Sequence, residues 1–302
     1  MINRVHIIDL HFQSAAHTIA SFLIETDQGP FLIETGPEST YAQLAQGIQT
    51  IGYNPEDIRH VFLSHIHFDH AGAAWKFAEM GANIYVHPKG AKHLASPERL
   101  WQSAKQIYGS EMERLWGQMQ PISPDLIIEA EDEEEFSVGN INLTAWHTPG
   151  HASHHIAWQV DQLIFTGDVA GVKINGGPVV PPCPPPDIDI ESWKASIKKI
   201  QNLHPDILYL THYGKVEDIN AHLEQLTLIL DDWAMWMKKP YDLKEDQKKV
   251  TSEFMAYTEG QLKAHGLDKG HIALYEYANP SWMSVAGLFR YWKQKESGKL
   301  DS

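Results

Sequence analysis

The stretch Val61-Phe62-Leu63-Ser64-His65-Ile66-His67-Phe68-Asp69-His70 decides how this chain is interpreted. Its three leading apolar residues predict a short buried strand. Three imidazoles and a carboxylate follow directly, and these are suitable ligands for zinc, iron or manganese. We expect His65 and His67 to project toward one spot, and Asp69 and His70 toward a second spot nearby. The stretch therefore offers room for two cations.

Three further candidate ligands occur in the same setting, directly after a predicted apolar strand. They are His151, Asp168 and His212, which follow strands expected over 141–146, 163–166 and 207–210. Side chains on loops at the ends of several strands are held in place by a rigid scaffold, which is how precise sites are built. The sequence therefore predicts one metal centre assembled from segments far apart in the chain.

The order and spacing of these elements resemble the metallo-β-lactamase superfamily over about residues 5–215. The matching motifs are H-x-H-x-D-H, T-P-G-H, G-D and T-H-Y-G, and Glu34-Thr35-Gly36 resembles the family's Asp-Thr-Gly with glutamate in place of aspartate. The resemblance implies an α/β protein with a four-layer αββα sandwich. It also implies one metal bound by His65, His67 and His151, a second bound by Asp69, His70 and His212, and Asp168 bridging both.

The activity implied by this resemblance is metal-dependent hydrolysis of a small-molecule substrate. Two divalent cations, zinc as first choice with iron or manganese as alternatives, would share a water that loses its proton near neutral pH. The hydroxide would attack the carbonyl of an acyl ester or thioester. Asp69 and Asp168 are the predicted catalytic carboxylates, and neither a serine nor a cysteine nucleophile is required.

Several other functions remain open at this level. The lactonase branch of the family typically has a tyrosine three positions after the bridging aspartate, where this chain has Gly171. A phosphodiesterase would use the same site, whereas a persulfide dioxygenase would hold a single iron through His65, His151 and Asp168. A ligand-binding effector without turnover is a further alternative. β-Lactam hydrolysis is disfavoured, because the commonest dinuclear β-lactamases carry a cysteine where Asp168 stands.

The composition limits the classes of binding partner and the cellular compartment that we expect. The chain has 24 lysines and arginines against 39 aspartates and glutamates, a formal net charge of −15, which repels nucleic acid backbones. It lacks an apolar run long enough for a membrane span or a secretion signal. A single cysteine, Cys183, suits a reducing compartment. We therefore expect a cytoplasmic protein that binds neither nucleic acid nor membrane.

Helical periodicity predicts two additions to the sandwich domain, which we place at residues 1–215. One is an insertion at about 96–120, and the other is an extension over 216–302 that begins with an apolar seam at 219–237. Both additions are rich in tryptophan, which would form an apolar wall for an acyl or aromatic group if they cap the metal cleft. The seam would also serve a homodimer. Asn279 and Pro280 are expected to be the N-cap and first residue of the last helix.

A proline-rich loop follows the predicted bridging aspartate. Residues 176–186 contain six prolines and can form neither a helix nor a central strand. We expect this stiff loop to border the mouth of the metal cleft, and Cys183 within it to be inert. Two histidines beside the ligand loop, His154 and His155, are candidates for hydrogen bonds to the ligands, whereas ordinary packing is expected for His17, His87 and His147.

Overall fold

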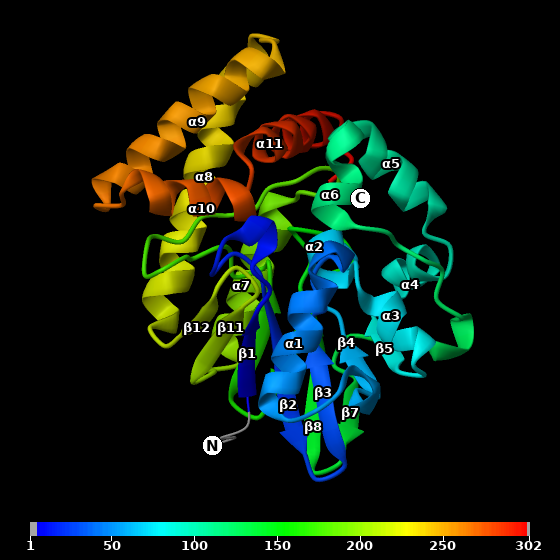
Figure 1. Ribbon diagram of the computed structural model, residues 1–302. Helices are drawn as coiled ribbons and strands as arrows, with labels where there is room; N and C mark the ends of the chain where they lie inside the picture. The colour runs from blue at the N-terminus through cyan, green and yellow to red at the C-terminus, as the bar shows by residue number, and fades with distance from the viewer. Residues whose placement is uncertain (1–4, 301–302) are drawn as a thin grey trace.

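The computed structural model describes residues 5–300 and contains two six-stranded sheets (Figure 1). The first sheet runs β1 (Val5–Asp9), β2 (Ala20–Thr26), β3 (Gly29–Ile33), β4 (His60–Phe62), β5 (Asn83–Val86) and β6 (Ile127–Glu129). In the second sheet, neighbouring strands again follow one another along the chain, as β7 (Glu135–Val138), β8 (Ile141–His147), β9 (Ile156–Val160), β10 (Leu163–Gly167), β11 (Ile207–Leu210) and β12 (Gly214–Val216). The chain thus completes one sheet before it begins the other.

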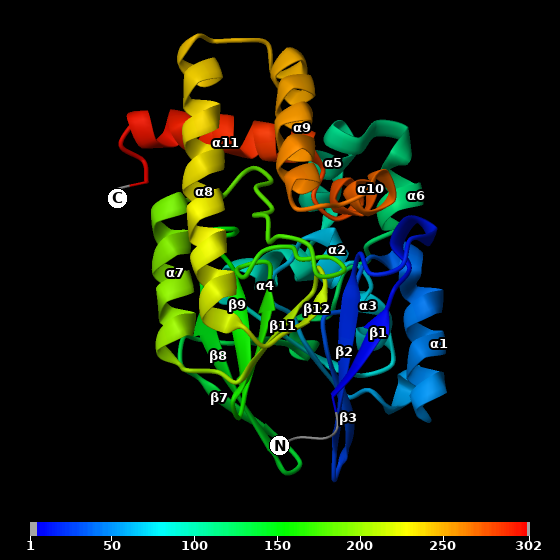
Figure 2. The ribbon, with the colours of Figure 1, turned by 90° about the vertical axis from the view of Figure 1, so that its left-hand side faces the viewer.

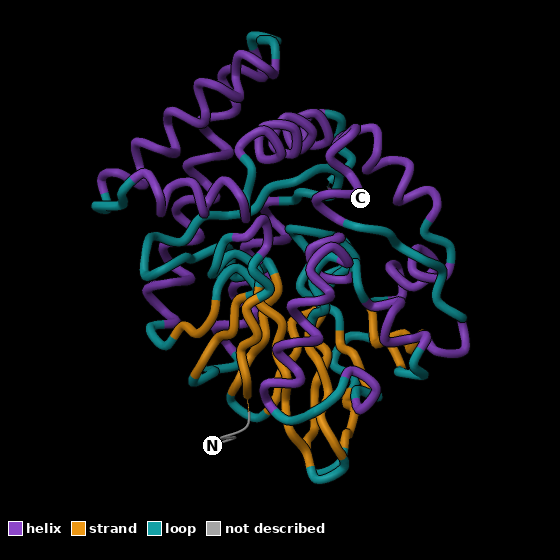
Figure 3. The backbone as a smooth tube through the Cα atoms, viewed as in Figure 1, coloured by secondary structure: helices purple, strands orange, loops and turns teal. Residues whose placement is uncertain are grey.

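Helices cover the outer faces of both sheets, which gives the predicted four layers (Figure 2). Figure 3 distinguishes the strands, in orange, from the helices, in purple. The first sheet packs on α1 (Tyr41–Ile51), α3 (Ala74–Glu79) and α4 (Pro88–Ala95), and the second on α7 (Ile190–Asn202) and α8 (Ile219–Asp242). Between the sheets lies an aromatic core that includes Phe22, Phe62, Trp158 and Phe165. Strands such as β2 are buried almost throughout, because both of their faces are covered.

The insertion is helical, but it is not one helix. It forms α5 (Glu98–Tyr108) and the short α6 (Met112–Trp116), separated by Gly109 at φ 56°. A glycine with positive φ, a conformation that glycine adopts readily, ends α5. The apolar period therefore continues across a turn that the period alone does not reveal. In Figures 1 and 2, α5 and α6 lie at the same end of the sandwich as α2 (Phe68–Ala71), which carries part of the histidine-rich stretch.

The carboxy-terminal extension consists of α8 followed by α9 (Gln247–Ala264), α10 (Lys269–Ala278) and α11 (Ser281–Glu296). The predicted seam of α8 is buried within the chain, where Leu226, Leu230 and Trp233 join one core with Trp193 of α7. The homodimer stays a prediction. The domain boundary near residue 215 also stays a prediction, and the apolar core is continuous across it. Among the helices of residues 5–300, none has both the length and the apolar character needed to cross a bilayer.

The expected start of the last helix is wrong by one residue. Helix α11 begins at Ser281, with Pro280 in the capping position. Asn279 instead closes α10, where its backbone N–H donates to the carbonyl of Tyr275 at 2.7 Å. Its side chain makes no cap: the amide nitrogen donates to the carbonyl of Pro181 in the proline-rich loop at 3.0 Å, and the amide oxygen accepts from the hydroxyl of Ser284 at 3.2 Å.

Candidate metal centre

The predicted ligands meet where strands of both sheets end. Strands β10 and β11 are parallel, and β8 runs the same way because it and β10 both pair antiparallel with β9. Their carboxyl ends therefore reach one edge of the second sheet, where they are followed by His151, Asp168 and His212. The end of β4 faces this edge from the first sheet, and the N–H of Ile156 donates to the carbonyl of Ser64 across the gap at 2.7 Å.

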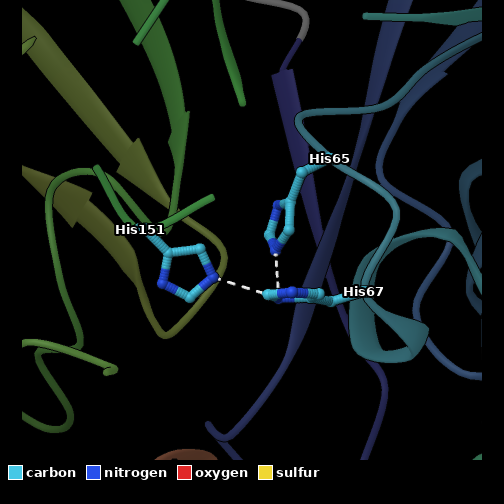
Figure 4. A group of neighbouring side chains, drawn as sticks. All are labelled: His65, His67 and His151. Atoms are coloured by element: carbon cyan, nitrogen blue, oxygen red, sulfur yellow. Dashed lines mark hydrogen bonds between the residues drawn. The ribbon is translucent and has the colours of Figure 1, made fainter. Parts of the chain in front are cut away.

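Three histidines form the first ligand group (Figure 4). The Nδ1 atom of His67 lies 2.9 Å from Nε2 of His65 and 3.1 Å from Nε2 of His151. Burial and the neighbouring imidazoles lower the pKa of His65 well below its usual value, and burial and His151 lower that of His67 to about 4. These rings are therefore neutral at neutral pH, the form that binds metals.

Backbone carbonyls determine which nitrogen faces the centre. Nδ1 of His151 lies 2.8 Å from the carbonyl of Pro182, and Nδ1 of His212 lies 2.7 Å from that of Thr18. A carbonyl can only accept a hydrogen bond, so each ring donates from Nδ1 and turns Nε2 inward. Contacts of this kind hold metal-ligating histidines in one tautomer.

The second ligand group combines Asp69, His70 and His212. Oδ2 of Asp69 lies 3.5 Å from Nε2 of His212 and 3.8 Å from Nε2 of His70. Burial alone would raise the pKa of Asp69, but these two histidines lower it to about 2. Burial alone would lower the pKa of His70, yet Asp168 and Glu34 raise it well above its usual value. Carboxylates therefore stabilise positive charge in this half of the centre.

Asp168 lies between the two groups, with one oxygen facing each. Its Oδ2 is 3.2 Å from Nε2 of His151, and its Oδ1 is 3.4 Å from Nε2 of His70 and 3.5 Å from Nε2 of His212. Its backbone N–H donates to Nε2 of His155 at 3.2 Å, which fixes the start of this loop.

The buried atoms of the centre are suited to a divalent cation. Nε2 of His70, Oδ1 of Asp168 and Nε2 of His212 are buried, and none makes a hydrogen bond. An unsatisfied buried polar atom costs roughly 1–3 kcal/mol, and here three of them converge on one space. Nitrogen and oxygen donors of this kind bind zinc, iron or manganese alike, so the donor set fits a divalent metal without selecting one.

Glu34 supports the centre from behind His70. Its backbone is in the left-handed region at φ 65°, a conformation that costs a non-glycine residue about 1–3 kcal/mol. The buried carboxylate accepts from Nδ1 of His70 at 3.1 Å and from the N–H of Ser64 at 3.3 Å. Although it replaces the aspartate expected from the family pattern, the longer side chain still reaches the ligand.

Glu34→Gln is expected to weaken metal binding without unfolding the protein. The amide keeps the size of the side chain and one acceptor oxygen, but it removes the negative charge that faces His70. Losing such a partner typically lowers metal affinity by roughly 10- to 100-fold, which competition with a chelator would measure. Glu25→Gln is a matched control, because Glu25 lies outside the centre, where its carboxylate is 2.6 Å from Nε2 of His6. Equal affinities in the two variants would contradict this role of Glu34.

The structure thus brings all seven predicted ligands together, with His154 and His155 beside them. His155 contacts Asp168 as expected, whereas Nδ1 of His154 is buried without a hydrogen bond, although its ring lies 5.9 Å from that of His67. The others pack elsewhere: His17 stacks on Tyr213, and His87 stacks on His147. The carbonyls of Thr18 and Pro182 could not be identified from the sequence, because every residue has a carbonyl.

The proline-rich loop lies beside the centre. The carbonyl of Pro182 contacts the outer nitrogen of His151, and residues 179–183 are buried, whereas Pro186 is exposed. The expected place of the loop at the mouth of a metal cleft stays a prediction. Solvent reaches the centre at Asp69, whose side chain is 20% exposed.

Cys183→Ser is expected to leave catalytic activity within a few-fold of wild type. The thiol is fully buried in the loop, and burial raises its pKa, so it supplies no thiolate. The buried hydroxyl costs stability of about 1–3 kcal/mol, which thermal unfolding would register. Activity and metal content measured below the unfolding transition should match wild type, and a loss of either one would show that the thiol takes part.

The fold and the centre define the class of protein. Two sheets packed face to face between helices, with a histidine- and aspartate-rich group at one edge, characterise the αββα metallo-hydrolases. Residues 16–212 match the sequence profile of the metallo-beta-lactamase superfamily, and the chain belongs to this family of hydrolases.

Relatives of this chain include proteins with several different activities. It is 33% identical over 177 residues to the metallo-beta-lactamase fold-containing protein ST1585 of Sulfurisphaera tokodaii, covering 57% of this chain and 67% of the relative. It is 29% identical to an N-acyl homoserine lactonase of Bacillus cereus, covering 60% of this chain and 74% of the lactonase. An atrochrysone carboxyl ACP thioesterase of Aspergillus fumigatus is 24% identical, with 69% of this chain and 44% of the thioesterase covered.

One solved structure shares nearly the whole architecture. The metallo-beta-lactamase family protein TTHA1429 from Thermus thermophilus superposes with a TM-score of 0.71 at 16% identity, covering 97% of this chain and 94% of that protein. At this identity the likeness concerns the fold alone, and its coverage takes in the carboxy-terminal helices.

Proposed function

We propose that this protein is a dinuclear metal-dependent hydrolase. His65, His67 and His151 would hold one divalent cation, Asp69, His70 and His212 a second, and Asp168 both. The observation that carries the proposal is the position of Asp168, whose Oδ2 faces His151 while its Oδ1 faces His70 and His212. A carboxylate shared in this way favours two cations over one.

The proposed reaction is hydrolysis of an acyl ester or a thioester. Lactones and thioesters both present a carbonyl carbon to a nucleophile, and a lactonase and a thioesterase are among the relatives. Bound divalent cations supply the chemistry by activating water and polarising the carbonyl oxygen. The chain's own residues keep the ligands in place: Pro182 and Thr18 orient imidazoles through their carbonyls, and His155 fixes the backbone of Asp168.

Aromatic side chains beside the centre support an apolar acyl or aromatic group as the substrate's recognition element. Phe68, between the proposed ligands His67 and Asp69, lies 5.9 Å from the ring of Trp101 and 6.3 Å from that of Trp116. Tyr108 continues this cluster, with its ring 5.6 Å from that of the partly exposed Trp282. Burial and the charge of Asp69 raise the pKa of Tyr108, so its hydroxyl stays protonated.

A lactone is the second candidate substrate class. The match to the N-acyl homoserine lactonase covers most of that relative and favours it. Gly171 argues against it, because the lactonase pattern described above has a tyrosine at this position. Thioesters therefore remain the first choice.

The test combines metal analysis with a substrate panel. Purified protein is analysed for zinc, iron and manganese, and then assayed on acyl thioesters, acyl esters, lactones and phosphodiesters with and without a chelator. Two metal equivalents and chelator-sensitive thioester or ester hydrolysis are expected. Preference for lactones or phosphodiesters would reassign the substrate. One iron with oxygen uptake on a persulfide would indicate a dioxygenase, and absence of metal-dependent turnover would favour a ligand-binding effector.

A further inference from the structure

The proline-rich loop connects the proposed metal centre to the carboxy-terminal helices. We call residues 176–186 the proline strap. Its six prolines lack N–H groups, so within the strap β-type pairing is confined to an isolated antiparallel bridge between Val180 and Val172. Several of its other carbonyls accept hydrogen bonds from distant parts of the chain. One of these carbonyls, that of Pro182, accepts from Nδ1 of His151 at 2.8 Å.

Several other contacts of the strap are made by α10, α11 and the turn between them. The amide of Asn279 donates to the carbonyl of Pro181 at 3.0 Å, and the hydroxyl of Tyr275 donates to that of Pro178 at 2.8 Å. Farther along, Nε of Arg290 donates to the carbonyl of Pro186 at 2.8 Å. At Gly287 the backbone of α11 packs so closely that an added Cβ would lie 2.0 Å from the carbonyl oxygen of Cys183. The helices therefore hold the strap along most of its length.

Adjacent carbonyls of the strap serve different partners. The carbonyl of Pro181 accepts from Asn279, and the next one, that of Pro182, accepts from His151. Proline fixes φ of Pro182 near −65°, so the peptide plane that carries the Pro181 carbonyl turns only together with the chain on either side of it. Losing the bond from Asn279 is therefore expected to shift the strap at the residue beside the carbonyl that holds the ring of His151.

We propose that Asn279 and Tyr275 are positioning residues for the metal centre, acting on His151 through the proline strap. The carboxy-terminal extension would then be part of the metal-binding apparatus, in addition to any wall that it offers the substrate. This inference rests on the proposed function, because it requires His151 to bind a metal ion.

The principal test compares Asn279→Leu with Gln261→Leu in the full-length protein. Both replacements remove a side-chain amide of similar size from the extension. Gln261 bonds to Asp232 and Trp233 within α8 and α9, away from the strap. Zn²⁺ affinity is measured by competition with a chelator. Asn279→Leu should weaken one of the two metal equivalents by roughly 10- to 100-fold, whereas Gln261→Leu should leave both within a few-fold of wild type.

A second pair keeps the proposal testable if Asn279→Leu fails to fold. Tyr275→Phe removes only the hydroxyl that holds Pro178, and Tyr257→Phe removes a hydroxyl that bonds Asp232 elsewhere in the extension. Tyr275→Phe should weaken the same metal equivalent, and Tyr257→Phe should not.

Nitrogen-15 NMR of the metal-free protein reports the tautomer of His151, which a general loss of stability would not change. His151 should carry its proton on Nδ1 in wild type and in Gln261→Leu, and it should populate both tautomers in Asn279→Leu. Equal metal affinities and an unchanged tautomer across each pair would overturn the inference while leaving the proposed function intact. A wild-type protein that binds no metal would overturn both.

Discussion

Asp168→Ala is expected to remove both metal equivalents and to lower hydrolysis by roughly three orders of magnitude or more. Metal activation supplies several kcal/mol of transition-state stabilisation, and each 1.36 kcal/mol corresponds to about tenfold in rate. Asp168 is the residue to change because its oxygens face both ligand groups. Elemental analysis after dialysis, together with the thioester assay, measures the two effects.

The control for this variant is Asp132→Ala, which removes an exposed carboxylate paired with Lys199 outside the centre. It should retain both metals and full activity. Asp168→Asn preserves the volume of the side chain, so it separates loss of charge from formation of a cavity, and we expect it to lose metal as well. Unchanged metal stoichiometry in Asp168→Ala would contradict the bridging role.

Gly150→Ala is expected to destabilise the fold by at least about 3 kcal/mol and to disrupt the position of His151. Gly150 has φ 135°, and a Cβ there would lie 2.2 Å from the Cα of Trp193 in α7. Overpacking against a rigid backbone costs about 1–3 kcal/mol or more, and the unfavourable φ adds to it. Thermal or denaturant unfolding measures the loss of stability, and the three-histidine group should bind its metal more weakly.

Gly52→Ala is the matched control for the steric part of this effect. Gly52 also has a positive φ, 111°, but a Cβ there would meet no atom within 4 Å. Gly52→Ala should show only the cost of backbone strain, roughly 1–2 kcal/mol. Similar losses of stability in the two variants would mean that α7 yields to the added methyl group.

The parts of the centre that were predictable from the sequence are those carried by residue type. Histidines and aspartates after apolar strands indicated the ligands, since few other residues bind metals and strand ends share a sheet edge. The supporting contacts of Thr18 and Pro182 were not predictable, because they use backbone carbonyls. The role of Asn279 was missed for a related reason: the Asn-Pro pair resembles a helix start, and only tertiary packing shows that its amide is engaged elsewhere.

In the fold, too, features carried by residue type were predictable, whereas features that depend on backbone conformation or tertiary packing were not. Apolar runs located most strands, and the helical period located the insertion, but the break at Gly109 depends on a positive φ that the period does not encode. Packing of the extension against the strap was beyond sequence reasoning, because it joins residues about 100 positions apart, such as Pro178 and Tyr275.

The arrangement of the two sheets gives the proposed cations a mechanical consequence. His65, His67, Asp69 and His70 follow a strand of the sheet formed by the first part of the chain, whereas His151, Asp168 and His212 follow strands of the other. Ions held by both sets would cross-link the halves at their shared rim, much as a disulfide does in secreted proteins. A chain with one cysteine has no internal disulfide to use for this purpose, so chelation would loosen the docking of one half on the other.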